Sequence, residues 1–74
     1  MTSTADTIRA AGAALFGPRF NTDLARLLGV SERTVRRWCA GEWEPLPFVW
    51  PALRLAMEQR MAEIRQTRKQ LPRG

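Results

Sequence analysis

The stretch that decides the fold is residues 21–41, which read NTDLARLLGVSERTVRRWCAG. Apolar residues recur in it with helical spacing on both sides of Gly29, which indicates two short helices. We expect the first helix over residues 22–28 and the second over residues 31–40. Gly29 suits the left-handed backbone conformation that ends a helix. The stretch therefore predicts two helices that cross at a tight turn.

The side chains of this stretch divide into helix caps and contacts between the helices. Asn21 and Ser31 are expected to cap the two helices through their side-chain oxygens. Ala25 is small at the point where the helices must approach closely. The apolar contacts between them are expected from Leu24, Leu28, Val30, Val35 and Trp38.

Glycine and proline divide the rest of the chain. Gly17-Pro18 ends a first helix expected over residues 2–16. After a loop stiffened by two prolines, a last helix is expected over about residues 48–68, with Pro51 in its first turn. No stretch alternates as a strand would. We therefore expect residues 1–74 to form one compact all-α domain of four or five helices, with a helix-turn-helix and a long C-terminal helix.

Composition and charge narrow the classes of function. The 74 residues carry a formal net charge of +5, and eleven of the twelve basic residues are arginine, which favours bidentate recognition of phosphate and guanine. The chain has no histidine, no metal-ligand cluster and no glycine-rich phosphate loop, so we expect neither an enzyme nor a bound cofactor or metal. An apolar run of about 18 residues and a secretory signal are both missing, so a cytoplasmic, nucleoid-associated protein without a membrane span is expected.

The outward face of the helix over residues 31–40 is basic. If Val35 and Trp38 are buried, the opposite side of the helix presents four residues at helical spacing: Arg33, Arg36, Arg37 and Ala40. The major groove of DNA is about 12 Å wide and admits a helix, and its base edges offer acceptors that arginine can bridge. This pattern favours double-stranded DNA as the partner, against the simpler interpretation of a solvated helix face.

Residues 21–41 also resemble the helix-turn-helix of the Cro and phage-repressor (Xre-type) family. The resemblance rests on Leu24-Ala25-x-x-Leu28-Gly29-Val30-Ser31-x-x-Thr34-Val35-x-x-Trp38 followed by Gly41, and it extends over roughly residues 8–55. It implies that Ser31, Glu32, Arg33 and Arg37 face base edges and that Asn21 touches phosphate. Two features depart from the family: the loop after the recognition helix carries Glu42 and Glu44 where basic residues are common, and the last helix is unusually long.

The residues expected to contact DNA fall into two groups, those that contact bases and those that contact the DNA backbone. Arg33 and Arg37 are expected to bind guanine O6 and N7, and Glu32 to accept from a cytosine amine. Ser31 completes the expected base contacts. The expected contacts to the DNA backbone are Arg19, Asn21, Thr34 and Arg36.

The tryptophans and the single cysteine have simpler expected roles. Trp38 is expected in the core, while Trp43 and Trp50 are expected to clamp the last helix onto the other three. Stacking on a nucleobase is the alternative for Trp43. Cys39 is expected to be a small buried thiol and not a redox sensor.

The last helix carries an apolar stripe that is longer than the domain needs. Its members are Trp50, Leu53, Met57, Met61 and Ile64, and Leu71 continues the spacing. We expect the first half to cover the core through Trp50, Leu53 and Leu55. The second half, with Met57, Met61 and Ile64, is then expected to form a homodimer interface, with the seven-residue spacing of Met57, Ile64 and Leu71 as its seam. The alternative is a helix that folds entirely onto its own domain.

Together these features predict a dimeric transcriptional repressor that reads an inverted repeat and occludes a promoter. One alternative is an antitoxin-type interaction module, whose last helix docks on a partner protein and whose DNA binding is secondary. Another is an architectural or excision factor that bends DNA.

Overall fold

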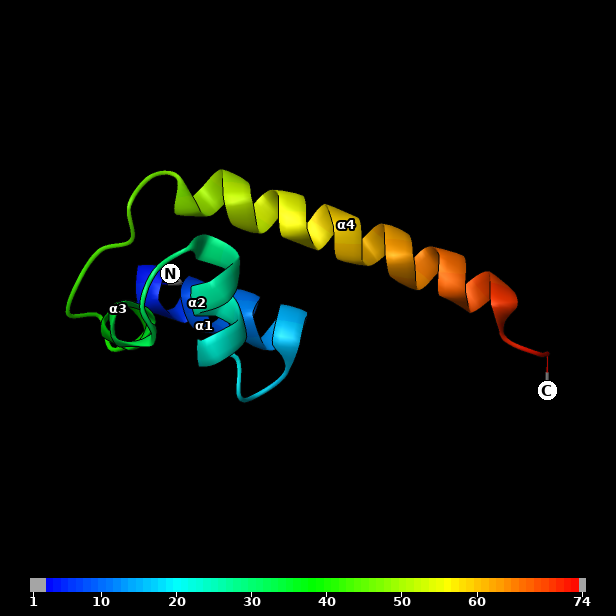
Figure 1. The fold of residues 1–74 in the computed structure, drawn as a ribbon, viewed down its shortest axis with the longest axis horizontal. Helices are drawn as coiled ribbons and strands as arrows, with labels where there is room; N and C mark the ends of the chain where they lie inside the picture. Colours follow the sequence, from blue (N-terminus) through cyan, green and yellow to red (C-terminus); the bar gives the residue numbers. More distant parts are fainter. Residues whose placement is uncertain (1–2, 74) are drawn as a thin grey trace.

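The computed structural model describes residues 3–73, which form four helices and no strand. They are α1 (Thr4–Phe16), α2 (Asn21–Leu28), α3 (Glu32–Cys39) and α4 (Val49–Gln70). Figure 1 shows α1, α2 and α3 gathered at one end of the molecule, with α4 running over them and continuing past them. The expected all-α fold with a long C-terminal helix is confirmed, with four helices in the described range. None of these helices combines the length and the apolar character needed to cross a membrane.

Two predicted helix starts are corrected by the backbone. Thr2, the expected start of α1, lies outside the described residues, and α1 begins at Thr4 because Ser3 caps it by accepting a hydrogen bond from the Asp6 amide at 3.1 Å. Asn21 is not a cap but the first residue of α2. The preceding residue, Phe20, already has helical dihedral angles (φ −90°, ψ −9°), and its carbonyl accepts from the Leu24 amide at 2.8 Å. Asn21 therefore cannot take the extended conformation that a capping side chain needs.

The turn between α2 and α3 follows the expected chemistry. Gly29 has a left-handed conformation (φ 70°), which a residue with a Cβ adopts at a cost. The next amide, that of Val30, donates to the Ala25 carbonyl at 3.0 Å and closes the end of α2. Ser31 is extended, and its hydroxyl accepts from the Thr34 amide at 3.1 Å. The predicted cap at Ser31 and the predicted turn at Gly29 are confirmed.

The core lies where α1, α2, α3 and the first turns of α4 meet. Its fully or nearly buried apolar residues are Ile8, Ala11, Leu15, Leu24, Ala25, Leu28, Val35, Trp38, Val49 and Leu53. The predicted contribution of Leu55 is wrong, since that side chain is 55% exposed. Leu55 lies two residues after Leu53, about 200° further around the helix, and so points away from the core. Val49 takes the expected place of Leu55.

One glycine permits close contact between α1 and the start of α2. A Cβ built on Gly12 would lie 2.6 Å from Cγ and 2.8 Å from Cε1 of the Phe20 ring. Such distances are far inside van der Waals contact, so the ring occupies the space that a side chain at residue 12 would need. The contact with Phe20 explains why residue 12 must be glycine.

The second half of α4 extends beyond the core. Residues 58–73 are all exposed, including the apolar side chains of Met61, Ile64 and Leu71. The last link to the core is the Arg60 guanidinium, which donates to the Leu15 carbonyl at the end of α1 at 2.7 Å. The described residues consequently measure 47 × 26 × 20 Å, with the end of α4 at one extreme of the long axis (Figure 1).

Candidate nucleic-acid interface

The basic face of α3 forms as the sequence indicates. Val35 and Trp38 are buried on the inner side, at 0% and 2% exposure. On the outer side one shallow depression is lined by the residues Arg33, Arg36, Arg37, Ala40 and Glu42. Three guanidinium groups thus share one exposed surface on a helix whose opposite side anchors it in the core.

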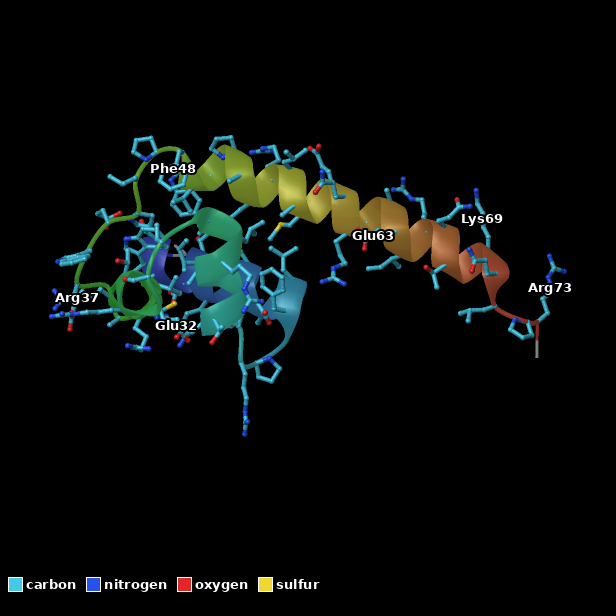
Figure 2. The ribbon with its side chains drawn as sticks, viewed as in Figure 1. Glu32, Arg37, Phe48, Glu63, Lys69 and Arg73 are labelled. Atoms are coloured by element: carbon cyan, nitrogen blue, oxygen red, sulfur yellow. The ribbon has the colours of Figure 1, made fainter. Side chains whose placement is uncertain are left out.

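Arg37 is held by an aromatic ring from the loop after α3. Its guanidinium carbon lies 4.3 Å from the centroid of the Trp43 ring, which is cation–π geometry. Gly41, with φ 78°, reverses the chain so that the amides of Glu42 and Trp43 both donate to the Arg37 carbonyl, at 3.0 and 3.4 Å. Figure 2 shows Arg37 at the end of the molecule opposite Lys69 and Arg73.

The predicted clamp at Trp43 is therefore wrong, whereas Trp50 does pack against the core. Trp43 is 48% exposed and lies beside Arg37, because the turn at Gly41 folds the loop back over the end of α3. Trp50 is partly buried at the edge of the core, on the second residue of α4. The cation–π pair could have been anticipated only from the helix end at Gly41, since the two partners are six residues apart.

The polar residues at the start of α3 are engaged with the protein itself. The Ser31 hydroxyl, besides its bond to the Thr34 amide, lies 2.9 Å from the Thr34 hydroxyl. One carboxylate oxygen of Glu32 accepts a hydrogen bond from the Thr22 hydroxyl. These contacts fix the start of α3 against α2, a role that sequence reasoning did not assign to Thr22. A base contact by Glu32 would have to share its carboxylate with Thr22 or break that bond.

The residues predicted to contact the DNA backbone lie on α3 or near its start. Thr22 joins Glu32, so the start of α2 stands beside the start of α3, and Asn21 is the half-buried neighbour of that junction. Arg19 is exposed in the connection between α1 and α2. Arg36 is exposed on α3, and Thr34 is half-buried through its contact with Ser31.

Arg9 ties the far end of α3 to α1. Its guanidinium donates to the Cys39 carbonyl at the end of α3 and to the Asp6 carboxylate one turn earlier in α1. The carbonyl groups at a helix C-terminus lack intrahelical partners, and a cation suits that end of the helix dipole. The sequence offered no signal for this contact, because residues 9 and 39 lie far apart along the chain.

Hydrogen bonds and burial shift two pKa values. Hydrogen bonds from Ser3, with a further contribution from Arg9, lower the pKa of the Asp6 carboxyl from its ordinary value of 3.8. Burial raises the pKa of the Cys39 thiol from its ordinary value of 9.0, although the charge of Arg9 opposes this shift. A partly buried thiol with a raised pKa is poorly reactive, in keeping with a packing role for Cys39.

Comparison of the chain with protein-family models, with curated protein sequences and with the solved structures gave no match. What α3 binds is therefore inferred from its geometry and charge. Within residues 3–73, no group of three or more histidine, cysteine, aspartate or glutamate side chains is placed to hold a metal ion.

Proposed function

We propose that the chain is a sequence-specific double-stranded DNA-binding regulator that inserts α3 into the major groove. The observation that supports this most strongly is the outer face of α3, where Arg33, Arg36 and Arg37 border one depression. The inner face of the same helix is locked in the core by Val35 and Trp38. A rigid helix with a basic exposed face, joined to a supporting helix by a tight turn, is the arrangement that enters a groove about 12 Å wide.

The arginines of α3 divide between bases and phosphates. Arg33 lies in the first turn of α3 and Arg37 one turn later, so both can point toward base edges from the same face. Bidentate pairing of arginine with guanine O6 and N7 is the commonest specific contact in the major groove. Arg36 and Thr34, with Asn21 and Arg19 from the neighbouring segment, are proposed to contact phosphates. Such contacts fix the position of the helix without reading sequence.

Ser31 and Glu32 have a structural role that limits their part in recognition. Ser31 caps α3, and Glu32 binds Thr22 across the turn. A contact from Glu32 to a cytosine amine is retained in the proposal as a secondary element of specificity. The main base readers are Arg33 and Arg37.

A dimeric repressor is the regulator that this chain fits best. Met61 and Ile64 are exposed and lack a partner within the described residues, whereas Met57, which was also expected to need a partner, already packs partly against the core. Self-association through these three residues would cover the exposed apolar surface. A two-fold dimer would set two copies of α3 on an inverted repeat, with half-sites about 34 Å apart. Repression would then follow from occlusion of a promoter. The proposed function is binding without catalysis, as the resemblance to the Xre-type family implies.

Titration of a labelled random-sequence duplex, followed by fluorescence anisotropy, tests whether α3 binds DNA. Arg36→Ala should weaken binding of every duplex, and the dependence on salt should become shallower by about one released counterion. Arg26→Ala is the matched control, because Arg26 is an exposed arginine on α2 away from the depression. Equal losses for both variants, or no binding by the native chain, would contradict the proposal.

A second candidate function has one observation in its favour. Met61 and Ile64 on α4, and Leu71 directly after it, are 54%, 58% and 63% exposed, and the same part of α4 carries Arg65, Arg68 and Lys69. Such a surface suits an interaction module of antitoxin type that binds a partner protein. Retention of a stoichiometric partner by the native chain, together with weak DNA binding, would favour this candidate over the repressor.

A further inference from the structure

The apolar side chains along α4 form a heptad stripe that continues from the core onto the exposed half of the helix. Trp50, Met57, Ile64 and Leu71 are each seven residues apart. Trp50 and Met57 lie half-buried at the edge of the core, whereas Ile64 and Leu71 are exposed. A seven-residue repeat drifts by only about 20° per heptad on a straight helix, so Trp50, Met57 and Ile64 stay on one side of α4. Leu71 follows the last helical residue with an extended backbone and borders the same hollow as Ile64.

Two hollows lie along this stripe, one at each end of α4. The first is a groove between α1 and α4, with Thr7 and Ala11 on one wall and Trp50 and Met57 on the other. The second lies beyond the core, under Ile64 and Leu71. Met61, on the wall of the first groove, lies between these two ends. A groove beside the core is thus followed, further along α4, by an exposed apolar segment.

We propose that α4 pairs in antiparallel orientation with α4 of a second copy of this chain, crossing between Arg60 and Met61. This inference rests on the self-association included in the proposed function, and it adds the orientation, the register and the contacts. With the crossing at that point, Met57 meets the partner's Ile64, and Trp50 meets the partner's Leu71. The register is self-complementary, as a two-fold interface requires. The exposed end of each α4 fills the groove between α1 and α4 of the other chain.

The charges beside the stripe select the antiparallel orientation. In the antiparallel register two pairs of opposite charge form, Glu58 with the partner's Arg65 and Glu63 with the partner's Arg60, against one approach of like charges, Arg54 to the partner's Arg68. In a parallel, in-register pair each of these residues would face its own copy, and the basic ends of the two helices would lie together. Those ends carry Arg65, Arg68, Lys69 and Arg73. Like charges at such positions disfavour pairing, and opposite charges set the orientation of paired helices.

The pairing leaves the proposed DNA-binding face uncovered. Figure 1 shows α3 at the end of the molecule away from the exposed half of α4. Two chains that cross near Met61 therefore keep their α3 helices apart, each at an outer end of the assembly. Dimer formation and DNA binding can then be measured separately.

Cysteine cross-linking without DNA tests the register. In a Cys39→Ala background, a Met57→Cys chain mixed with an Ile64→Cys chain should give a disulfide-linked heterodimer on mild oxidation. The Ile64→Cys chain alone should give little product, because the two copies of residue 64 are about 10 Å apart along the antiparallel pair at 1.5 Å per residue. Efficient self-linking of Ile64→Cys would show a parallel pair and overturn the proposal.

Charge reversal gives an independent test that does not alter the apolar seam. In sedimentation equilibrium, Glu58→Arg and Arg65→Glu should each weaken dimerisation by roughly tenfold, and the chain with both reversals should regain most of the native affinity. The two residues are two helical turns apart within one chain, so this rescue requires contact between chains. A native chain that stays monomeric at about 100 µM, well above the micromolar range of modest affinities, would reject the inference. Sequence-specific DNA binding by such a monomer would leave the proposed DNA-binding role of α3 intact.

Discussion

The three arginines on the outer face of α3 are held to different degrees. Arg37 lies against the Trp43 ring at 4.3 Å, so part of its conformational freedom is already lost before any ligand binds. Arg33 and Arg36 are exposed on the same depression. A side chain ordered in advance loses less entropy on binding. Both arginines are proposed to contact bases, and Arg37 is expected to do so at a smaller cost in conformational entropy than Arg33.

Replacing Arg33 should alter which sequence is preferred, not merely how tightly DNA binds. Arg33→Ala should cost about 1–3 kcal/mol on the preferred site and relax the preference at one base pair. Competition binding against a set of single-base variants of that site measures both effects. A loss that is uniform across all variants would show that Arg33 contacts phosphate instead.

Removing the ring under Arg37 should weaken DNA binding while the fold is kept. Trp43→Ala should cost about 0.5–1.5 kcal/mol of binding free energy, because Arg37 must then be ordered on binding, and immobilising a long side chain costs roughly that much. Trp43→Phe is the matched control and should retain most of the affinity, since it keeps an aromatic face. Thermal unfolding of both variants should match that of the native chain, because Trp43 is half exposed. A large drop in melting temperature for Trp43→Ala would instead support a clamping role.

At the scale of the helices, two contacts from α1 explain how its partners are placed. The Phe20 ring occupies the space above Gly12 and sets where α2 begins. Arg9 binds the Cys39 carbonyl and holds the end of α3. The first contact joins residues eight apart and the second joins residues 30 apart, and together they fix how α2 and α3 lie against α1.

A methyl group at residue 12 should destabilise the fold. Gly12→Ala adds a Cβ that would lie 2.6 Å from Cγ of Phe20, so the ring must move out of its packed position. Overpacking of this kind costs about 1–3 kcal/mol of stability. Alanine has the better helix propensity, which returns only about 1 kcal/mol, so the net effect is a loss over most of that range. Denaturant unfolding should show a lower midpoint for Gly12→Ala. The penalty should shrink in a Phe20→Leu background, and an undiminished penalty would place its cause elsewhere.

The cap of α1 should make stability depend on pH in the acid range. Because the pKa of Asp6 is lowered in the folded chain, its ionised form contributes stability above the ordinary pKa of 3.8, and this contribution is lost as the pH falls through the lowered value. Asp6→Asn should therefore be less stable than the native chain at about pH 7, and the difference should close as the pH falls through the lowered pKa. Thermal unfolding over a series of acid pH values measures it. A difference that persists unchanged in acid would show that the carboxylate charge is not its cause.

The bounds and buried faces of the helices could be predicted where capping residues and apolar periodicity agree. They could not be predicted where contacts with residues outside the helix determine the backbone. Ser31, Gly29 and the buried pair Val35 and Trp38 follow from local rules and are confirmed. The cap at Asn21 was wrong because Phe20 is already drawn into helical geometry. Spacing gave the basic face of α3, but it could not give the Trp43 ring beside Arg37, which depends on how Gly41 turns the chain.

At the scale of the whole molecule, the long axis of 47 Å separates two surfaces with different proposed roles. One end presents α3, and the other presents the exposed half of α4 (Figure 2). The sequence indicated that α4 is longer than its core requires, and the structure gives the boundary near Arg60, which binds the Leu15 carbonyl. Leu55 was wrongly predicted to cover the core, because the apolar pattern of α4 does not by itself show which side of the helix faces the core and which faces away. This separation would allow one chain to pair through α4, as proposed, while α3 remains open to DNA.

Selection of bound sites from random duplex DNA, repeated at low and moderate salt, tests the central claim that α3 reads sequence in the major groove. We expect an enriched inverted repeat that contains guanines, with half-sites about ten base pairs apart or a multiple of that distance, and enrichment that survives moderate salt. Binding without an enriched motif that disappears as salt rises would mean that phosphate attraction alone drives it. That result would contradict the claim and would favour the second candidate function, in which the exposed half of α4 binds a partner protein.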